Sequence, residues 1–135
     1  MTKLKLFEAF AGIGAQAKSL KNIGVDFESV GVAEVDGDAI KSYAAVHADT
    51  SNVTIPSEEE MQAYMERLNI PLDKKGNRRI LKDTELESVY KSSVAIKNVG
   101  DISKVKDFPE MDLFTYSFPC QSISFAGYGH GLDRG

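Results

Sequence analysis

The single cysteine of the chain, Cys120, lies where it suits chemistry better than packing. It stands between Pro119 and Gln121, directly after an apolar stretch with the composition of a strand. A structural cysteine would more naturally lie inside that strand. A thiol in the turn after it can be exposed and ionised, and the thiolate is the nucleophilic form. We therefore expect Cys120 to be a nucleophile, and the alternative is an inert core cysteine.

A second candidate site is the segment "FAGIGAQA" at residues 10–17, between a predicted strand and a predicted helix. Gly12, Gly14 and Ala17 form a Gly-x-Gly-x-x-Ala pattern, which permits a tight turn and points helix amides at a ligand. Close packing of a helix on a strand also favours small residues, so the pattern alone has two interpretations. Glu34 ends the next predicted strand, about 20 residues further on, where carboxylates commonly accept ribose hydroxyls. Together these features predict a nucleotide-like cofactor, of either the NAD or the S-adenosylmethionine type.

The elements that must position these residues alternate along the chain. Apolar patterning predicts strands over residues 3–9, 27–34 and 111–117, and helices over residues 15–22 and 37–47. This order of strands, turns and helices implies parallel strands with helices on the faces of the sheet, which is an α/β fold.

The region between residues 49 and 97 breaks this alternation, because it contains no strand pattern. Ser57 with Glu60 and Thr84 with Glu87 have the spacing of capping boxes and predict two helix starts. We interpret residues 50–97 as a mostly helical insertion. Its two apolar stripes consist of Met61, Tyr64, Met65 and Leu68, and of Leu86, Val89 and Tyr90.

Between these two helices lies a basic loop, "DKKGNRR", at residues 73–79. One interpretation is the solvated tip of a hairpin. The other is a loop that contacts phosphates, since clustered lysine and arginine neutralise a nucleic-acid backbone.

Composition excludes several classes of protein. At 135 residues the chain has the size of one domain, and no apolar run approaches the ~20 residues that span a bilayer. A lone cysteine cannot form an internal disulfide, which favours a reducing cytoplasm. His47 and His130 match no metal-ligand spacing, so we expect no metal. The net charge of −4 argues against strong nucleic-acid binding by this chain alone.

Three segments taken together, "FEAFAGIGAQ", "GDIS" and "FTYSFPCQSISFAG", resemble the C5-cytosine-specific DNA methyltransferases. In that family a Phe-x-Gly-x-Gly loop opens the chain and a Pro-Cys-Gln loop supplies the nucleophile. The resemblance covers about residues 4–49 and 98–135. It implies a Rossmann-like S-adenosylmethionine-dependent fold, with an incomplete parallel sheet that carries helices on both faces. It also implies transfer of a methyl group to C5 of cytosine in duplex DNA, through a covalent cysteine adduct and base flipping, as in restriction-modification.

The resemblance also assigns roles to individual residues. Cys120 is the expected catalytic residue, and Asp101 is the expected partner of the adenine amino group. The expected cofactor contacts are Phe10, Ala11, Gly12, Gly14, Glu34, Val35, Asp101, Ile102 and Pro119; those to the base or its phosphates are Gln121, Ser122 and Ser124. Without the family context, the alternative for Asp101 is an Asx turn or a helix cap ahead of Ile102.

The sequence departs from the family pattern at three positions. Ala15 replaces the second glycine of a usual pair, Glu8 replaces a common aspartate, and Val35 replaces a bulky ring. The family's Glu-Asn-Val motif, its Arg-x-Arg pair, its DNA-reading domain and its final cofactor helix have no counterpart in these residues. We therefore expect the N-terminal part of a catalytic domain, which needs a downstream polypeptide and does not methylate DNA by itself.

Two other classes stay open at this point. An NAD(P)-type Rossmann domain explains the glycine turn and Glu34, but it leaves the Pro-Cys-Gln turn without a role. A catalytically inactive interaction module would keep the fold and lose the chemistry. Binding of NADH compared with S-adenosylmethionine separates the first of these from a methyltransferase, and covalent trapping by a 5-fluorocytosine DNA separates the second.

Overall fold

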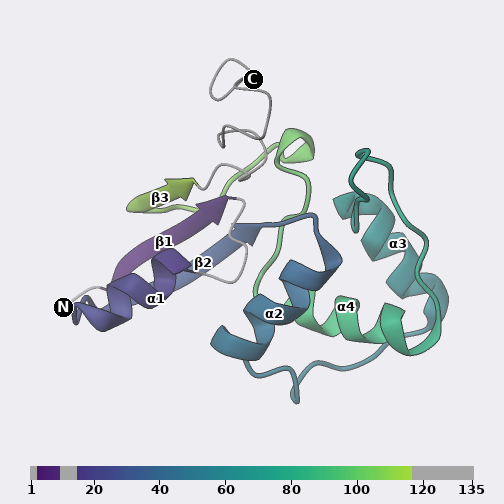
Figure 1. Ribbon diagram of the computed structural model, residues 1–135, viewed down its shortest axis with the longest axis horizontal. Helices are drawn as coiled ribbons and strands as arrows, with labels where there is room; N and C mark the ends of the chain where they lie inside the picture. The colour runs from purple at the N-terminus through teal and green to yellow at the C-terminus, as the bar shows by residue number, and fades with distance from the viewer. Residues whose placement is uncertain (1–2, 10–14, 117–135) are drawn as a thin grey trace.

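The computed structural model describes residues 3–9 and 15–116 of the chain (Figure 1). Both helices predicted before residue 49 are confirmed with their ends, and the three predicted strands are confirmed within two residues. In order, the elements are β1 (Leu4–Ala9), α1 (Ala15–Asn22), β2 (Phe27–Ala33), α2 (Gly37–His47), α3 (Glu58–Leu68), α4 (Asp83–Ala95), the 3-10 helix η1 (Ile102–Lys104) and β3 (Leu113–Tyr116).

The three strands form a parallel sheet in the order β2-β1-β3. A bulge between Leu6 and Phe7 shifts the register of β1 against β2. Beyond β2, Val32 and Asn98 form a parallel bridge, and the Val99 amide donates to the Val32 carbonyl at 2.8 Å. The segment around Asn98 therefore pairs with β2 at this edge of the sheet, as a fourth parallel strand would. The predicted α/β fold is confirmed.

One face of the sheet is covered by helices. Because side chains alternate along a strand, Leu6 and Glu8 of β1 point to the same side. Glu8 accepts hydrogen bonds from the Ala17 amide in α1 and from the Tyr43 hydroxyl in α2. Val32 of β2 belongs to the same buried cluster as Tyr43 and Ile40. Helices α1 and α2 therefore pack on this face, and α4 packs on α2 (Figure 1).

The opposite face carries Phe7, Ala9 and Ala33. The Phe7 ring stacks on that of Phe114 in β3, with centroids 5.7 Å apart, and meets Phe108 edge to face. Among the described residues this face is covered by η1 and the loop that leads to β3, and Phe108 and Phe114 are still exposed. An α-helical layer on this second face stays a prediction.

Helices α3 and α4 occupy the predicted insertion. Ser57 caps α3 and accepts from the Glu60 amide at 3.2 Å, as predicted. The predicted stripes are the inward faces of both helices, where Tyr64 and Tyr90 are partly buried. Both helices belong to the cluster that also buries Val32 and α2, so they contribute to one core with the sheet. The buried stripe residues are Met61, Met65, Leu68, Leu86 and Val89.

The predicted capping box of Thr84 with Glu87 is wrong. The N-cap of α4 is Lys82, which makes no side-chain capping bond. The Leu86 amide donates to the Lys82 carbonyl, so Thr84 already lies inside the first turn. Leu81 is buried immediately upstream, and Asp83 turns the chain into the helix with a φ of +55°, so the helix begins before Thr84 without a side-chain cap.

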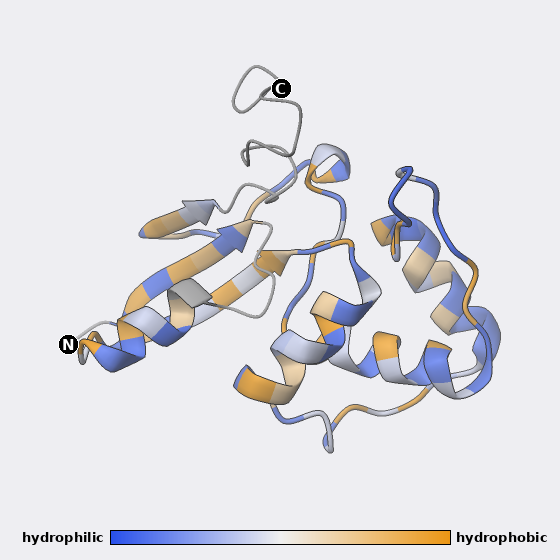
Figure 2. Cartoon of the chain, in the orientation of Figure 1, coloured by the Kyte–Doolittle hydropathy of each residue, from blue (hydrophilic) through white to orange (hydrophobic). Residues whose placement is uncertain are grey.

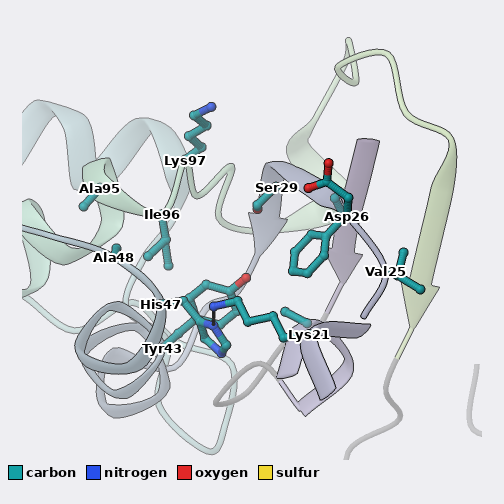
Figure 3. A pocket seen from close by; sticks show the side chains of 12 residues that line it. Lys21, Val25, Asp26, Ser29, Tyr43, His47, Ala48, Ala95, Ile96 and Lys97 are labelled. Carbon is teal, nitrogen blue, oxygen red and sulfur yellow. Dashed lines mark hydrogen bonds between the residues drawn. The ribbon is translucent and has the colours of Figure 1, made fainter. Parts of the chain in front are cut away.

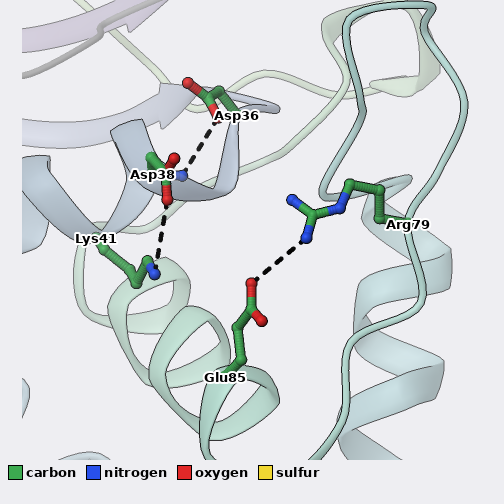
Figure 4. A network of polar contacts seen from close by, with 5 residues as sticks. All are labelled: Asp36, Asp38, Lys41, Arg79 and Glu85. Carbon is green, nitrogen blue, oxygen red and sulfur yellow. Dashed lines mark hydrogen bonds and ion pairs between the residues drawn. The ribbon is translucent and has the colours of Figure 1, made fainter.

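The basic loop at residues 73–79 is a hairpin turn, and its tip is hydrophilic (Figure 2). An antiparallel bridge joins Leu72 to Arg78 at its base, and Asp73 accepts from the Lys75 and Asn77 amides. Arg79 forms an ion pair of 3.6 Å with Glu85 at the start of α4, which offsets part of the positive charge (Figure 4). The hairpin interpretation is confirmed; the phosphate contact stays a prediction.

Gly100 marks a close approach between two segments. Its φ of +77° belongs to the left-handed region, and a Cβ at this position would lie 2.3 Å from the Leu68 carbonyl oxygen. Gly24 has nearly the same φ, +78°, but nothing lies within 4 Å of its Cβ position. A side chain at Gly24 would therefore meet backbone strain alone, whereas a side chain at Gly100 would meet both strain and a steric clash.

We predict that Gly24→Ala lowers the free energy of unfolding by about 1–2 kcal/mol, the strain of a left-handed alanine. Gly100→Ala should cost about 1–3 kcal/mol more, because the Leu68 turn must move as well. Urea denaturation of the parent and both variants measures this difference. Equal losses in the two variants would contradict the close packing of Gly100 on Leu68.

Candidate active site

The carboxyl ends of all three strands meet at one edge of the sheet. Ala9, the last residue of β1, pairs with both Ala33 of β2 and Tyr116 of β3. Chain order places β2 on one side of β1 and β3 on the other, so the strand order reverses at β1. Ligands of open α/β sheets bind in the crevice at such a reversal, beyond the carboxyl ends of the strands. This edge is therefore the candidate site.

Most of the predicted contact residues lie outside the described part of the chain. The predicted glycine turn follows directly after Ala9, and the predicted nucleophile loop follows after Tyr116. Their roles stay predictions. The residues concerned are Phe10, Ala11, Gly12, Gly14, Pro119, Cys120, Gln121, Ser122 and Ser124.

Glu34 directly follows β2 at this edge and is only 7 % exposed. Its Oε2 accepts hydrogen bonds from the backbone amides of Val35 and Asp36, each at 3.0 Å. Two amide donors orient the carboxylate and help to offset the cost of burying its charge. Val35 packs its side chain against the cluster formed with α2 and α4. Asp36 then caps α2 by accepting from the Asp38 amide (Figure 4).

Asp101 caps η1, as its alternative interpretation predicted. Its Oδ1 accepts from the Ser103 amide and hydroxyl, and its Oδ2 accepts from Asn69 Nδ2 at 2.9 Å. Partial burial alone would raise the pKa of Asp101, but these hydrogen bonds outweigh it and hold the pKa below its usual value. Ile102 packs against the Phe7 face of the sheet. Capping and ligand binding are compatible, because an ionised carboxylate offers about four acceptor positions.

Residues that the sequence patterns did not single out connect Glu34 with Asp101. The side chain of Asn98 bonds to the backbone of Glu34 and to the Gly100 amide. The C-terminal end of α3 provides another connection, since the Leu68 carbonyl accepts from the Asp101 amide at 3.0 Å. Just beyond it, the Leu72 amide donates to the Val35 carbonyl at 2.8 Å. No local spacing signals such contacts, because their partners are far apart in sequence.

Glu8 lies one position before the end of β1 and is fully buried. Its Oε1 accepts from the Tyr43 hydroxyl at 2.5 Å, and the Ala17 amide of α1 also donates to the carboxylate. Burial raises the pKa of Glu8, and the bonds from Tyr43 and Ala17 reduce that rise. The same burial and the neighbouring Glu8 raise the pKa of Tyr43. Glu8 thus ties both helices to β1 next to the predicted glycine turn.

A cavity of about 370 Å³ opens elsewhere, between α1, α2 and the amino-terminal half of β2 (Figure 3). Lys21 and His47 meet across it with Nζ and Nδ1 3.4 Å apart, and Phe27 and Ser29 form part of its wall. Because Phe27 begins β2 and Glu34 follows its end, this cavity is not the crevice at the carboxyl edge.

Comparison with known proteins connects this edge to a family. The sequence profile of the C-5 cytosine-specific DNA methylases matches residues 56–135 of the chain, which is more than half of it. The chain belongs to this family. The expected resemblance is confirmed, and the match includes the segment around Asp101 and the Pro-Cys-Gln turn.

Individual relatives match over nearly the whole chain. A type II methyltransferase, M2.ScrFI of Lactococcus lactis subsp. cremoris, is 42% identical over 96% of this chain and 38% of its own length. The orphan methyltransferase M.SssI of Spiroplasma monobiae is 37% identical over 98% of this chain and 38% of its own. The orphan methyltransferase M.SPBetaI of Bacillus phage SPbeta is 36% identical, again over 98% of this chain. The chain thus spans about two-fifths of the length of the first two.

Within residues 3–9 and 15–116, no helix has the length and apolar character needed to cross a membrane. In the same ranges, no three histidine, cysteine, aspartate or glutamate side chains gather as a metal site would require.

The buried Glu8–Tyr43 pair predicts a pH-dependent loss of stability in Tyr43→Phe. A raised carboxyl pKa means that Glu8 contributes most stability below its unfolded pKa, and that this contribution falls as the pH rises through the folded value. Removing the Tyr43 donor raises the pKa further, so the variant should lose more stability at about pH 8 than at about pH 5. We expect a loss of about 1.5–3 kcal/mol at the higher pH, as for a hydrogen bond to a charged group.

Tyr64→Phe is the matched control. Tyr64 is a partly buried tyrosine, but it donates to the neutral Ser93 hydroxyl at 2.9 Å. The loss of stability in Tyr64→Phe should be nearly the same at both pH values. The charge of His47 acts on Glu8 in the parent and in Tyr43→Phe alike, so it largely cancels in the comparison. Urea denaturation at the two pH values measures the free energy of unfolding of the parent and both variants. A pH-independent loss in Tyr43→Phe would refute the proposal that the Tyr43 hydroxyl stabilises the ionised form of Glu8.

Proposed function

We propose that the protein is a DNA (cytosine-5-)-methyltransferase that transfers a methyl group from S-adenosylmethionine to C5 of cytosine in duplex DNA. The observation that carries this proposal is the level register of the three strand ends at Ala9, Ala33 and Tyr116. The residues that follow these ends are the glycine turn, Glu34 and the Pro-Cys-Gln turn. Family membership supports the same reaction.

The described residues at this edge fit the adenosine part of the cofactor. Glu34 offers a buried carboxylate whose direction is set by two backbone amides, and such an acid at a strand end suits ribose hydroxyls. Asp101, with its lowered pKa, stays ionised at neutral pH and suits the adenine amino group. When bound, S-adenosylmethionine supplies an electrophilic methyl group. By resemblance, residues 10–14 would hold its methionine end.

In this proposal the thiolate of Cys120 adds to C6 of the target cytosine. The addition makes C5 nucleophilic, which it is not in the aromatic ring, and C5 would then take the methyl group as its bond to the donor sulfur breaks. Loss of the C5 proton and elimination of the Cys120 thiolate from C6 would restore the aromatic ring and the free enzyme. The ring can meet a thiol only outside the base stack, so the target base must flip out of the duplex. Gln121, Ser122 and Ser124 are proposed to contact the extruded base or its phosphates. Pro119 stiffens the turn by fixing its own φ.

The reaction is proposed for the intact protein in which this sequence occurs, since the chain spans about two-fifths of its first relatives. The net charge of −4 gives these residues little electrostatic attraction for phosphates. Duplex DNA is therefore the proposed partner of the intact protein. Absence of a disulfide partner for Cys120 in the sequence fits the reducing cytoplasm as the proposed compartment.

The proposed role of Glu34 predicts the cofactor affinity of Glu34→Gln. This change keeps the size of the side chain and removes the charge that strengthens hydrogen bonds from ribose hydroxyls. We expect binding of S-adenosylmethionine to weaken by about 1.5–3 kcal/mol, measured by calorimetric titration.

Glu28→Gln is the control for charge and strand, since Glu28 is exposed on the same strand β2 and should not affect affinity. Unchanged affinity in Glu34→Gln would remove Glu34 from the site. Tight binding of NADH in place of S-adenosylmethionine would replace the proposal with an NAD(P)-type domain.

The proposed role of Cys120 predicts that Cys120→Ser abolishes methylation by the intact protein while its cofactor affinity stays near that of the parent. A serine hydroxyl is barely ionised near neutral pH, whereas a cysteine thiol with a pKa of about 8.5 needs only a modest shift. Mass spectrometry should detect a covalent adduct of the parent with 5-fluorocytosine DNA and none of the variant. Methylation that persists in Cys120→Ala would show that the thiol is dispensable, and an inert parent would favour an inactive interaction module.

A further inference from the structure

The side chain of Asn98 forms four hydrogen bonds in the part of the structure closest to the proposed adenosine site. Its Oδ1 accepts from the Glu34 amide at 3.0 Å and from the Gly100 amide at 2.9 Å. Its Nδ2 donates to the Glu34 carbonyl at 3.0 Å and to Ser93 Oγ at 3.1 Å. A carboxamide has two donors and two acceptor positions, so Asn98 is fully satisfied, and it is only 7 % exposed.

On the Glu34 side, Asn98 takes the place of a neighbouring strand. The pairing of β1 with β2 ends at Ala33, so Glu34 is the first residue beyond the ladder. Asn98 bonds to both the amide and the carbonyl of Glu34, as a residue on a paired strand would. The backbone from which the Glu34 carboxylate projects is thereby held in place at the strand end.

On the other side, the same carboxamide holds the turn that leads to Asp101. The Gly100 amide bonds to Asn98, and Gly100 packs directly on the Leu68 carbonyl, which also accepts from the Asp101 amide. Gly100 adopts a φ that other residues rarely use, so this turn has little freedom. One side chain therefore fixes both backbone segments that carry the two proposed adenosine carboxylates.

Asn98 is itself anchored from the helical layer. Ser93 of α4 accepts from Asn98 Nδ2, and it also accepts from the Tyr64 hydroxyl of α3. Ser93 is fully buried, so the network of Tyr64, Ser93, Asn98 and Glu34 runs through the core from α3 to the strand end. In a water-free interior such a network is rigid only if every member is paired, which is the case for the Asn98 carboxamide.

We propose that Asn98 is a positioning residue that sets the separation between Glu34 and Asp101 and so preorganises the adenosine half of the cofactor site. The inference rests on the proposed function, because it assigns these two carboxylates to the cofactor. Asn98 touches neither cofactor nor base in this proposal. Its alteration should therefore weaken cofactor binding and leave the turnover rate at saturating cofactor close to that of the parent.

Asn98→Asp is the sharpest test, because it keeps the shape of the side chain and removes both Nδ2 donors. An anionic oxygen then faces the Glu34 carbonyl. Gln62→Glu is the matched control: Gln62 Nε2 also donates to a backbone carbonyl, that of Leu81 at 2.7 Å, but between α3 and the start of α4. Amide hydrogen exchange measured by NMR reports on the backbone without cofactor, and calorimetry reports on affinity for S-adenosylmethionine.

In Asn98→Ser, whose side chain is too short to accept from both the Glu34 and Gly100 amides, we expect exchange at these amides to accelerate at least about tenfold. In Asn98→Asp, which keeps the acceptor oxygen and loses both donors, we expect cofactor affinity to fall by about tenfold or more. In Gln62→Glu both the exchange rates and the cofactor affinity should stay within about twofold of the parent, even if its thermal stability falls as much as that of the Asn98 variants. Unchanged exchange at both amides in Asn98→Ser, or unchanged affinity in Asn98→Asp, would overturn the inference. An intact protein that binds no S-adenosylmethionine would refute the proposed function, while the exchange data still decide whether Asn98 holds the two segments.

If Asn98→Asp does not fold, the cofactor affinity of Asn98→Ser tests the inference, because its smaller, neutral side chain is too short to bridge Glu34 and Gly100. The parent provides an independent readout, because cofactor binding should slow exchange at the Glu34 and Gly100 amides together. Protection of only one of them would show that the two segments are not coupled through Asn98.

Discussion

Parallel pairing of β1 with a strand on each side is the constraint on which the remainder of the structure depends. Because β2 and β3 run in the same direction as β1, each connection must cross back over the sheet before the next strand can begin. Helix α1 makes the first crossing, and α2, α3 and α4 lie within the second. The level pairing of Ala9 with Ala33 and Tyr116 brings the loops that leave all three strands to one edge. In the proposed function, this edge is where the glycine turn and the cysteine turn would share a site with Glu34.

Three acids near this edge show how the protein handles charge in its interior. Glu8 is fully buried and has a raised pKa, Glu34 is nearly buried and bonded to two amides, and Asp101 has a lowered pKa and three donors. Burying a carboxylate is costly unless donors replace water. For Glu8 and Asp101 some of the donors come from other segments, so these hydrogen bonds also dock the segments. Glu8 draws α1 and α2 onto β1, and Asp101 ties its turn to the end of α3.

The helices between β2 and the Asn98 bridge therefore belong to the architecture of the site as well as to the core. Residues at the end of α3 and just beyond it bond to Val35 and Asp101, and Ser93 of α4 supports Asn98. The basic hairpin grows from this same segment, since Leu72 at its base bonds to Val35. The cavity between α1 and α2 lies at the opposite end of β2 and is separate from this arrangement.

Much of the fold follows from local sequence alone. Apolar patterning and turn residues located β1, β2, β3, α1 and α2 within two residues, because each element depends mainly on its own period and ends. The segments "FEAFAGIGAQ", "GDIS" and "FTYSFPCQSISFAG" indicated the family, since such motifs depend on residue type and spacing, which need no coordinates.

Only the tertiary structure decided the start of α4, the surroundings of Glu8, and the role of Asn98. Leu81 just upstream is buried in the core and Asp83 begins α4 with a φ of +55°, so the helix starts before Thr84 and forgoes a side-chain cap worth about 1 kcal/mol. Asn98 contacts Glu34 across 64 positions of sequence, and Glu8 meets Tyr43 across 35. Such bonds exist because packing of the sheet and helices brings the partners together in a dry interior, where an unpaired polar group is costly. A pattern of neighbouring residues does not indicate which distant polar groups will pair.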